Sequence, residues 1–150
     1  MRVVLQRVLE AAVHVVEEGS RREAGRIGTG ILALVGFTSG DGEEALSWMA
    51  GKLADLRVFP GPGGAMDRSL RETNGGLLLV SQFTLYADPR KGRRPDFTAA
   101  ASYAEAERLF ERFREACEAQ LPGRVESGLF GAKMEVSLVN DGPVTLVIER

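Results

Sequence analysis

The alternation of apolar and polar side chains at the start of the chain predicts two β-strands. Residues Met1–Val8 alternate, and the pattern returns in Ala12–Val16, before a turn signal at Glu18–Ser20. A period of two residues is typical of a strand with one buried face, so we expect these two segments to pair with each other. A third segment, Ile31–Phe37, is almost entirely apolar, which predicts a central strand buried on both faces.

Two later segments have the helical period. The first predicts a helix over about Glu43–Arg57, with Asp41 and Glu44 spaced as in a capping box. Its apolar residues at three- and four-residue steps are Leu46, Met49, Leu53 and Leu56. The second predicts a longer helix over Ser102–Leu121, ended by Pro122 and Gly123. Its apolar residues are Leu109, Phe110, Phe113, Cys117 and Leu121.

The rest of the chain is rich in strand patterns separated by short turns. Prolines and glycines in 59–76 predict a loop or irregular hairpin, and a strand follows over Gly76–Leu85. Three further strands are expected over 124–129, 134–139 and 144–149, the last two separated by a turn at Asn140–Pro143. Short connections favour antiparallel pairing, so we expect an α+β fold, with one domain over residues 1–150.

The composition excludes several classes of site. The chain has one cysteine and one histidine, so it holds neither a disulfide framework nor a Cys/His zinc site. We expect no metal and no cofactor. The first residues contain no continuous apolar run of the kind found in a signal peptide or membrane span, which predicts a cytoplasmic protein without membrane contact.

The charge is weakly negative overall, with one basic segment. The net charge is −2 and the sequence pI is about 5.5, so the molecule as a whole does not attract a polyanion. Four of the five residues in Arg90–Arg94 are nevertheless cationic. Any contact with nucleic acid is therefore expected to be local, through phosphate groups at this segment.

Residues that often carry catalysis have structural interpretations here. His14 lies among valines in a predicted strand, with no serine elbow or partner acid indicated elsewhere. Cys117 lies on the apolar face of the second helix, where nothing nearby lowers the pKa of a thiol. The glycines at Gly28–Gly30 and Gly61–Gly64 match neither a dinucleotide fingerprint nor a phosphate-binding loop.

Two polar segments interrupt otherwise apolar strands. Ser81–Thr84 places three hydrogen-bonding side chains after a run of four apolar residues, and buried polar groups of this kind need a partner or a ligand. Asn140–Thr145 contains the Gly142–Pro143 bond, of the type in which a cis peptide costs only about 0.5–1 kcal/mol. Taken alone, each segment also fits an ordinary strand end or turn.

Together these segments resemble the two signature motifs of the D-aminoacyl-tRNA deacylases. The similarity extends in register to Gln6–Val8, Gly28–Gly36, Lys91–Pro95 and Gly128–Met134, and so covers essentially the whole chain. The resemblance implies a largely antiparallel, barrel-like β-sheet with two covering helices. It also implies hydrolysis of the ester of D-aminoacyl-tRNA without a cofactor. Activity on mischarged glycyl-tRNA stays open, although a backbone filter for chirality should admit an achiral residue.

The resemblance further implies a homodimer with its active site at the subunit interface. Ser81, Gln82, Phe83 and Thr84 would form the catalytic segment of one subunit. The other subunit would insert Gly142 and Pro143, whose cis peptide rejects L-aminoacyl-tRNA by a clash with rigid backbone. The order of the strands, and the ranking among D-amino acids and tRNAs, stay open.

Further roles follow from the same resemblance. Arg7 would brace the Gly-Pro segment, while Phe130 and Met134 would line a pocket for the terminal adenosine. The main-chain N–H groups of Phe83 and Thr84 are candidates for an oxyanion hole. The attack would be assisted by the Thr84 hydroxyl or by the 2′-hydroxyl of the tRNA, and we favour the latter because no base is evident beside Thr84.

The cationic residues expected to hold the phosphates of the acceptor stem are Arg90, Lys91, Arg93 and Arg94. Two other functions remain open at this point. An RNA-binding module without catalysis would need the basic segment but neither polar motif. An esterase for small molecules would leave the basic segment unexplained, and it lacks a recognisable nucleophile and base.

Overall fold

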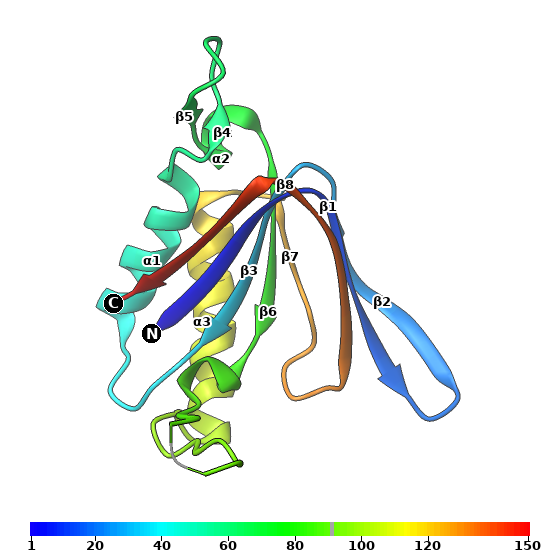
Figure 1. Cartoon of the computed structure of the whole chain (residues 1–150), viewed down its shortest axis with the longest axis vertical. Coiled ribbons are helices and arrows are strands. Elements are labelled where there is room, and N and C mark those ends of the chain that lie inside the picture. Colours follow the sequence, from blue (N-terminus) through cyan, green and yellow to red (C-terminus); the bar gives the residue numbers. More distant parts are fainter. Residues whose placement is uncertain (91) are drawn as a thin grey trace.

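The computed structural model describes residues 1–90 and 92–150 and confirms the α+β fold (Figure 1). In the described part of the chain, six strands form one strongly curved sheet in the order β2–β1–β3–β6–β7, with β8 paired to β1. β1 is antiparallel to β2, β3 and β8, whereas β6 is parallel to β3 and β7. The strands are β1 (Arg2–Glu17), β2 (Ser20–Ile27), β3 (Gly30–Gly36), β6 (Gly76–Ser81), β7 (Val125–Ser127) and β8 (Met134–Glu149).

The two predicted N-terminal strands are one continuous strand, so the prediction that they pair with each other is wrong. The first half of β1, Arg2–Val8, pairs with β3, and the second half, Ala11–Glu17, pairs with β2. The chain reverses only at Gly19, because nothing between Val8 and Ala12 forms a turn. β2 was not predicted, since its sequence is polar and most of its side chains are exposed.

β8 is also one strand where two were expected. Both of its halves pair with β1, and they do not pair with each other across a turn. Gln6 lies opposite Thr145 and Val8 lies opposite Asn140, so Arg7 alone in β1 faces residues 141–144 in β8. The predicted turn is therefore a bulge, which lies where β8 bends sharply at the top of Figure 1.

The two predicted helices are present as α1 (Glu43–Asp55) and α3 (Tyr103–Gln120). The capping box expected at Asp41 is wrong, because the N-cap is Gly42 and has no side-chain hydrogen bond. The Asp41 carboxylate instead accepts a hydrogen bond of 2.9 Å from the N–H of Thr38.

The segment between α1 and β6 forms an irregular hairpin, as predicted, followed by a short helix. The hairpin consists of β4 (Phe59–Pro60) and β5 (Met66–Arg68), and it projects from one end of the molecule in Figure 1. The helix α2 (Leu70–Thr73) was not predicted. Its capping box joins the side chain of Ser69 to the backbone of Glu72, and the Glu72 carboxylate to the backbone of Ser69.

The central strands are buried on both faces, as their apolar sequences predict. On one face, the side chains of β3 and β6 pack against α1 and α3, and Phe113 lies at 0% exposure among them. On the other face, alternate residues such as Leu32 and Leu78 pack inside the curve of the sheet against Val8 and Val13. The curved sheet thus has a core on each side.

Candidate functional site

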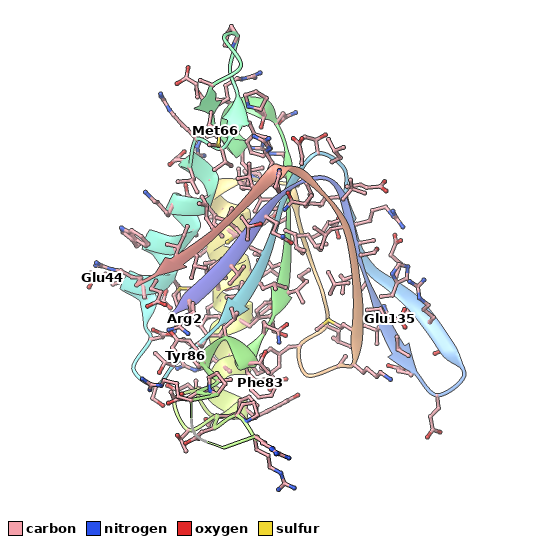
Figure 2. The ribbon with its side chains drawn as sticks, viewed as in Figure 1. Arg2, Glu44, Met66, Phe83, Tyr86 and Glu135 are labelled. Carbon is pink, nitrogen blue, oxygen red and sulfur yellow. The ribbon has the colours of Figure 1, made fainter. Side chains whose placement is uncertain are left out.

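The catalytic segment predicted from the sequence lies where the chain leaves the sheet at the end of β6. The predicted strand over 76–85 ends at Ser81, and a 3-10 helix, η1 (Phe83–Tyr86), follows. Gln82 joins the two elements, and its N–H donates to the carbonyl of Val35 at 2.7 Å. Figure 2 shows Phe83 and Tyr86 at this end, opposite the hairpin that carries Met66.

A cavity of about 540 Å³ lies against this segment. Ser81 and Gln82 provide polar groups, whereas Phe130 from the loop before β8 and Met134 at the start of β8 provide an aromatic and a thioether wall. Tyr103 and Ala106 at the start of α3 complete the enclosure. A mostly apolar cavity with a few polar groups is typical of a site that binds a small molecule or part of a larger ligand.

Aromatic contacts hold the walls of the cavity in place. The ring of Phe130 packs against Tyr103, with centroids 5.2 Å apart, and against Phe110 in the core, at 5.9 Å. Phe83 is 56% exposed and packs on Phe97, at 5.1 Å. Aromatic rings therefore tie the loop before β8 to α3, and tie η1 to the loop that follows it.

The catalytic segment offers backbone donors and no strong base. Thr84 is exposed, and its hydroxyl accepts a hydrogen bond from the side-chain amide of Gln82. The N–H groups of Leu85 and Ala87 bond to carbonyls within the turn, whereas the first N–H groups of a helical turn have no such partner. The main-chain N–H groups of Phe83 and Thr84 are thus free to donate hydrogen bonds to an oxyanion, whereas the segment has no group that would abstract a proton.

The second motif occupies the bulge in β8. The peptide between Gly142 and Pro143 is cis, and Gly142 has a φ of +134°. A Cβ atom on Gly142 would lie 2.7 Å from Cγ2 of Val144 and 2.9 Å from its backbone nitrogen, so a side chain does not fit. Asn140 closes the bulge, because its side chain accepts from the N–H of Val144 at 3.0 Å and donates to the Val144 carbonyl at 3.2 Å.

Arg7 holds the bulge from the opposite strand. Its Nε donates to the backbone carbonyl of Asp141 at 3.1 Å and lies 3.0 Å from the Asp141 carboxylate. Its Nη1 donates to the carbonyl of Val58, beside the base of the hairpin. The side chain of Arg7 is 10% exposed, so these contacts are largely shielded from water. One guanidinium thereby contacts three acceptors, namely the carbonyl and the carboxylate of Asp141 and the carbonyl of Val58.

Within one chain the two motifs do not meet. The cavity is lined by Ser81, Gln82 and Phe83, and its lining includes no residue of 140–145. Figure 1 places the bend of β8 and the end of β6 at opposite ends of the sheet. Each motif is therefore positioned by its own part of the fold.

The basic segment lies in the loop between η1 and α3. The loop is closed by paired backbone hydrogen bonds between Asp88 and Asp96. Arg90 donates to the Asp88 carboxylate, which holds the pKa of that carboxyl below its usual range. Arg93 and Arg94 are exposed, whereas Lys91, the fourth cation predicted to bind phosphate, lies outside the described residues.

The whole chain matches a known family. The family model described as D-Tyr-tRNA(Tyr) deacylase matches residues 4–149. The chain belongs to this family. A D-aminoacyl-tRNA deacylase from Stenotrophomonas maltophilia (strain K279a) is 58% identical over 149 residues, which cover 99% of each chain. Another from Nitratidesulfovibrio vulgaris (strain DP4) is 53% identical over 154 residues, covering 99% of this chain and 93% of the relative.

Solved structures have the same fold. The structure described as c-Myc DNA Unwinding Element Binding Protein matches with a TM-score of 0.92 and 36% identity, covering 100% of this chain and 99% of that one. A structure described as a probable eukaryotic D-amino acid tRNA deacylase matches with a TM-score of 0.81. At 22% identity, the second match supports the fold alone.

Other residues weighed from the sequence lie away from the cavity. His14 in β1 pairs with Glu23 and Glu135 of the neighbouring strands, and Cys117 is 1% exposed in the core. Burial raises the pKa of the Cys117 thiol to about 12. Among the described residues, no three His, Cys, Asp or Glu side chains group as metal ligands, and no helix is long and apolar enough to span a membrane.

Several residues of the cavity were missed in the sequence. Tyr103 and Ala106 line it from the start of α3, Ala101 from the loop before that helix, and Val80 and Val136 from two strands. The valines and alanines carry no sequence signal that separates them from core residues. Tyr103 did carry one, because it is a large aromatic residue placed directly after the N-cap serine, in a helical turn that is otherwise polar or small.

Replacing Arg7 tests how strongly the bulge is held. Arg7→Met leaves the Asp141 carboxylate and the Val58 carbonyl without their donor, so we expect the free energy of unfolding to fall by about 2–3 kcal/mol. Arg21→Met is the matched control, because it breaks an ion pair with Glu135 whose partners are 53% and 57% exposed. It should cost less than about 1 kcal/mol. Urea denaturation measures both, and equal losses would contradict this role for Arg7.

The Cys117 thiol should resist alkylation in the folded protein. With its pKa at about 12, about one thiol in ten thousand is ionised at pH 8, and the core also shields it. Incubation with iodoacetamide at pH 8 should therefore leave the native mass unchanged, while the same treatment in concentrated urea adds one adduct. Labelling of the native protein as fast as the unfolded one would show that the helix packing opens readily.

Proposed function

We propose that the protein hydrolyses the ester bond of D-aminoacyl-tRNA, releasing a D-amino acid and tRNA, and rejects L-aminoacyl-tRNA by a Gly-cisPro segment donated across a homodimer. Family membership and the names of its relatives indicate D-aminoacyl-tRNA deacylase activity, which makes the protein a hydrolase of the aminoacyl-tRNA ester. The observation that carries the finer proposal is the separation of the two motifs. The cavity beside Ser81–Phe83 and the bulge at Gly142–Pro143 lie at different places in one chain.

A second copy of the chain would bring together the two motifs that lie apart in a single chain. β8 pairs with β1 along one edge, and no strand of the described residues covers its other edge. Exposed apolar side chains lie along β8, namely Val136, Val139, Leu146 and Val147. A long exposed edge with apolar side chains favours association. In a symmetric dimer each subunit gives and receives the same contact, so each bulge would complete the cavity of the partner subunit.

The bulge has the properties that a chirality filter needs. Gly142 has no room for a side chain, and Asn140 and Arg7 hold the backbone on either side of it. Backbone held in this way cannot move aside for a side chain of the wrong hand, so rejection would be a clash with main-chain atoms. A glycyl ester has no side chain to clash, so mischarged glycyl-tRNA is also a proposed substrate.

The catalytic segment would stabilise the tetrahedral oxyanion rather than provide a nucleophile. The Thr84 hydroxyl accepts a hydrogen bond from Gln82, and no titratable group acts on it as a base in the described residues. We therefore assign the assisting role to the 2′-hydroxyl of the terminal ribose, and a positioning role to Thr84. The N–H groups of Phe83 and Thr84 would stabilise the tetrahedral oxyanion, at about 3–4 kcal/mol for each donor.

The basic loop would hold the tRNA without distinguishing its sequence. Arg93 and Arg94 are exposed close in sequence to Phe97, whose ring packs on Phe83 of the catalytic segment. Contacts to phosphate position a nucleic acid but carry no base information, which suits an enzyme that accepts many tRNAs. Arg90 and Lys91 are part of the same proposal. Because the substrate is a tRNA, we place the protein in the cytoplasm.

Matched D- and L-tyrosyl-tRNA distinguish the proposed function from its alternatives. The purified protein should release D-tyrosine and leave the L ester at its spontaneous rate, because only the L side chain meets the bulge. Amino-acid release over time is the measurement. Equal hydrolysis of both esters would remove the chirality filter and leave a general esterase. Binding of both without hydrolysis would indicate an RNA-binding module.

Mixing two inactive variants tests the shared site. Gln82→Ala should inactivate the cavity by removing a polar group of the catalytic segment. Gly142→Ala should inactivate the bulge, because the added Cβ would lie 2.7 Å from Val144 and would displace the backbone that completes the partner subunit's cavity. After both are unfolded and refolded together, half of the dimers are mixed, and each contains one site with both motifs intact. Deacylation should therefore recover to about a quarter of the wild-type rate. Refolding each variant alone is the control, and no recovery in the mixture would contradict a site shared between subunits.

A further inference from the structure

Tyr103 is an exposed aromatic residue on the rim of the cavity. It is the first residue of α3, directly after the N-cap Ser102, and it is 64% exposed. Its ring packs edge-on against Phe130, with centroids 5.2 Å apart and an interplanar angle of 69°. A single exposed aromatic residue is common at protein surfaces, but this one also lines the cavity beside Phe130.

The side chain is held in one place although water surrounds much of it. Its hydroxyl lies over the backbone of Gly131, because a Cβ atom on that glycine would be 2.2 Å from the Tyr103 Oη. Gly131 has a φ of +72°, which favours glycine, so the loop provides a flat backbone surface for the phenol. Phe130 and Gly131 together orient the ring before any ligand binds.

The chemistry of the rim matches a nucleoside better than a peptide or lipid. Phe130 and Met134 provide apolar surfaces that suit a flat base, and Ser81 and Gln82 provide polar groups at the catalytic side. Tyr103, which also lines the cavity, adds a hydroxyl that donates and accepts hydrogen bonds, as a ribose or phosphate requires. A ring with two side-chain torsions loses little entropy when a ligand covers it.

We propose that Tyr103 is a positioning residue that hydrogen-bonds the sugar-phosphate of the terminal nucleotide through its hydroxyl and closes the outer wall of the cavity with its ring. This inference rests on the proposed function and adds a residue to it. Tyr103 touches no reacting bond, so it sets how tightly and in which orientation the nucleotide binds. The effect should therefore fall on KM rather than on kcat.

Two substitutions separate the hydroxyl from the ring. Tyr103→Phe keeps the packing on Phe130, and we expect KM for D-tyrosyl-tRNA to rise about fivefold, with kcat within about twofold of wild type. Tyr103→Ala also removes the wall and should raise KM by about a further factor of ten. Tyr86→Phe is the matched control, because Tyr86 packs on Arg2 and lines no part of the cavity. It should leave KM unchanged.

A minimal substrate tests which part of the tRNA is contacted. Adenosine 5′-monophosphate esterified with D-tyrosine at the ribose contains only the terminal nucleotide, and Tyr103→Phe should raise its KM by the same factor. An increase confined to the full tRNA would place the contact on the acceptor stem and overturn the inference. Unchanged KM values for both substrates would also overturn it, and so would a loss of kcat at unchanged KM.

Calorimetric titration with adenosine 5′-monophosphate gives a readout that does not need hydrolysis. Tyr103→Phe should weaken this binding about fivefold, while the thermal melting temperature stays within about 1 °C of wild type. If the wild-type protein binds the nucleotide, Tyr103→Phe weakens that binding about fivefold and no D ester is hydrolysed, the proposed function fails while the contact of Tyr103 with the nucleotide stands. If Tyr103→Phe binds the nucleotide as tightly as wild type, the assignment of Tyr103 fails on its own.

Discussion

The antiparallel ladder between β1 and β8 determines where the candidate functional groups of the chain lie. β1 has β8 along one edge, and β3 and then β2 along the other, so it belongs to both halves of the curved sheet. Where the sheet bends, β8 contains residues 141–144 opposite Arg7 alone. A single buried guanidinium fills that mismatch by bonding to Asp141 and Val58. The bulge is thus part of the ladder rather than a loose loop.

The cavity depends on a different constraint, namely how α3 packs on the sheet. Phe110 of α3 lies in the core and contacts Phe130, which in turn contacts Tyr103. The β7–β8 loop is therefore fixed to the helix, because its Phe130 packs against two aromatic rings of α3. β6 ends at Ser81 against the same cavity, so the core that holds the helix on the sheet also sets the width of the site.

The sequence predicts those helices and strands in which burial sets the spacing of the apolar residues. α1 and α3 have regular apolar faces, and β3 and β6 are apolar on both faces, so their types and places were predicted. The fold class was also predicted, through pattern and resemblance. β2 was missed because an exposed strand at the edge of a sheet needs no apolar alternation.

The errors share one physical cause, which is that pairing partners are not encoded locally. The break after Val8 and the Gly-Pro pair at Gly142 both look like the ends of strands, yet each lies within a long strand held by partners distant in sequence. Asp41 has the spacing of a helix cap, but its carboxylate bonds to the loop at Thr38 instead. The motif residues of the candidate site were found by resemblance, whereas Tyr103 required the packing on Phe130 and Gly131 to be seen.

The proposed site would combine a rigid segment that selects the substrate with catalytic groups that are only weakly activated. Arg7 and Asn140 fix main-chain atoms around Gly142, and in the proposed function a clash with this fixed backbone would distinguish the hand of the substrate. The catalytic segment, by contrast, contains Gln82 and Thr84, which bond to each other, and backbone donors. Such a segment would accelerate hydrolysis of an activated ester only if the substrate is held in one orientation. The energy for that orientation must come from groups that bind the nucleotide beyond the reacting bond, and Tyr103 at the rim of the cavity is placed to contribute it.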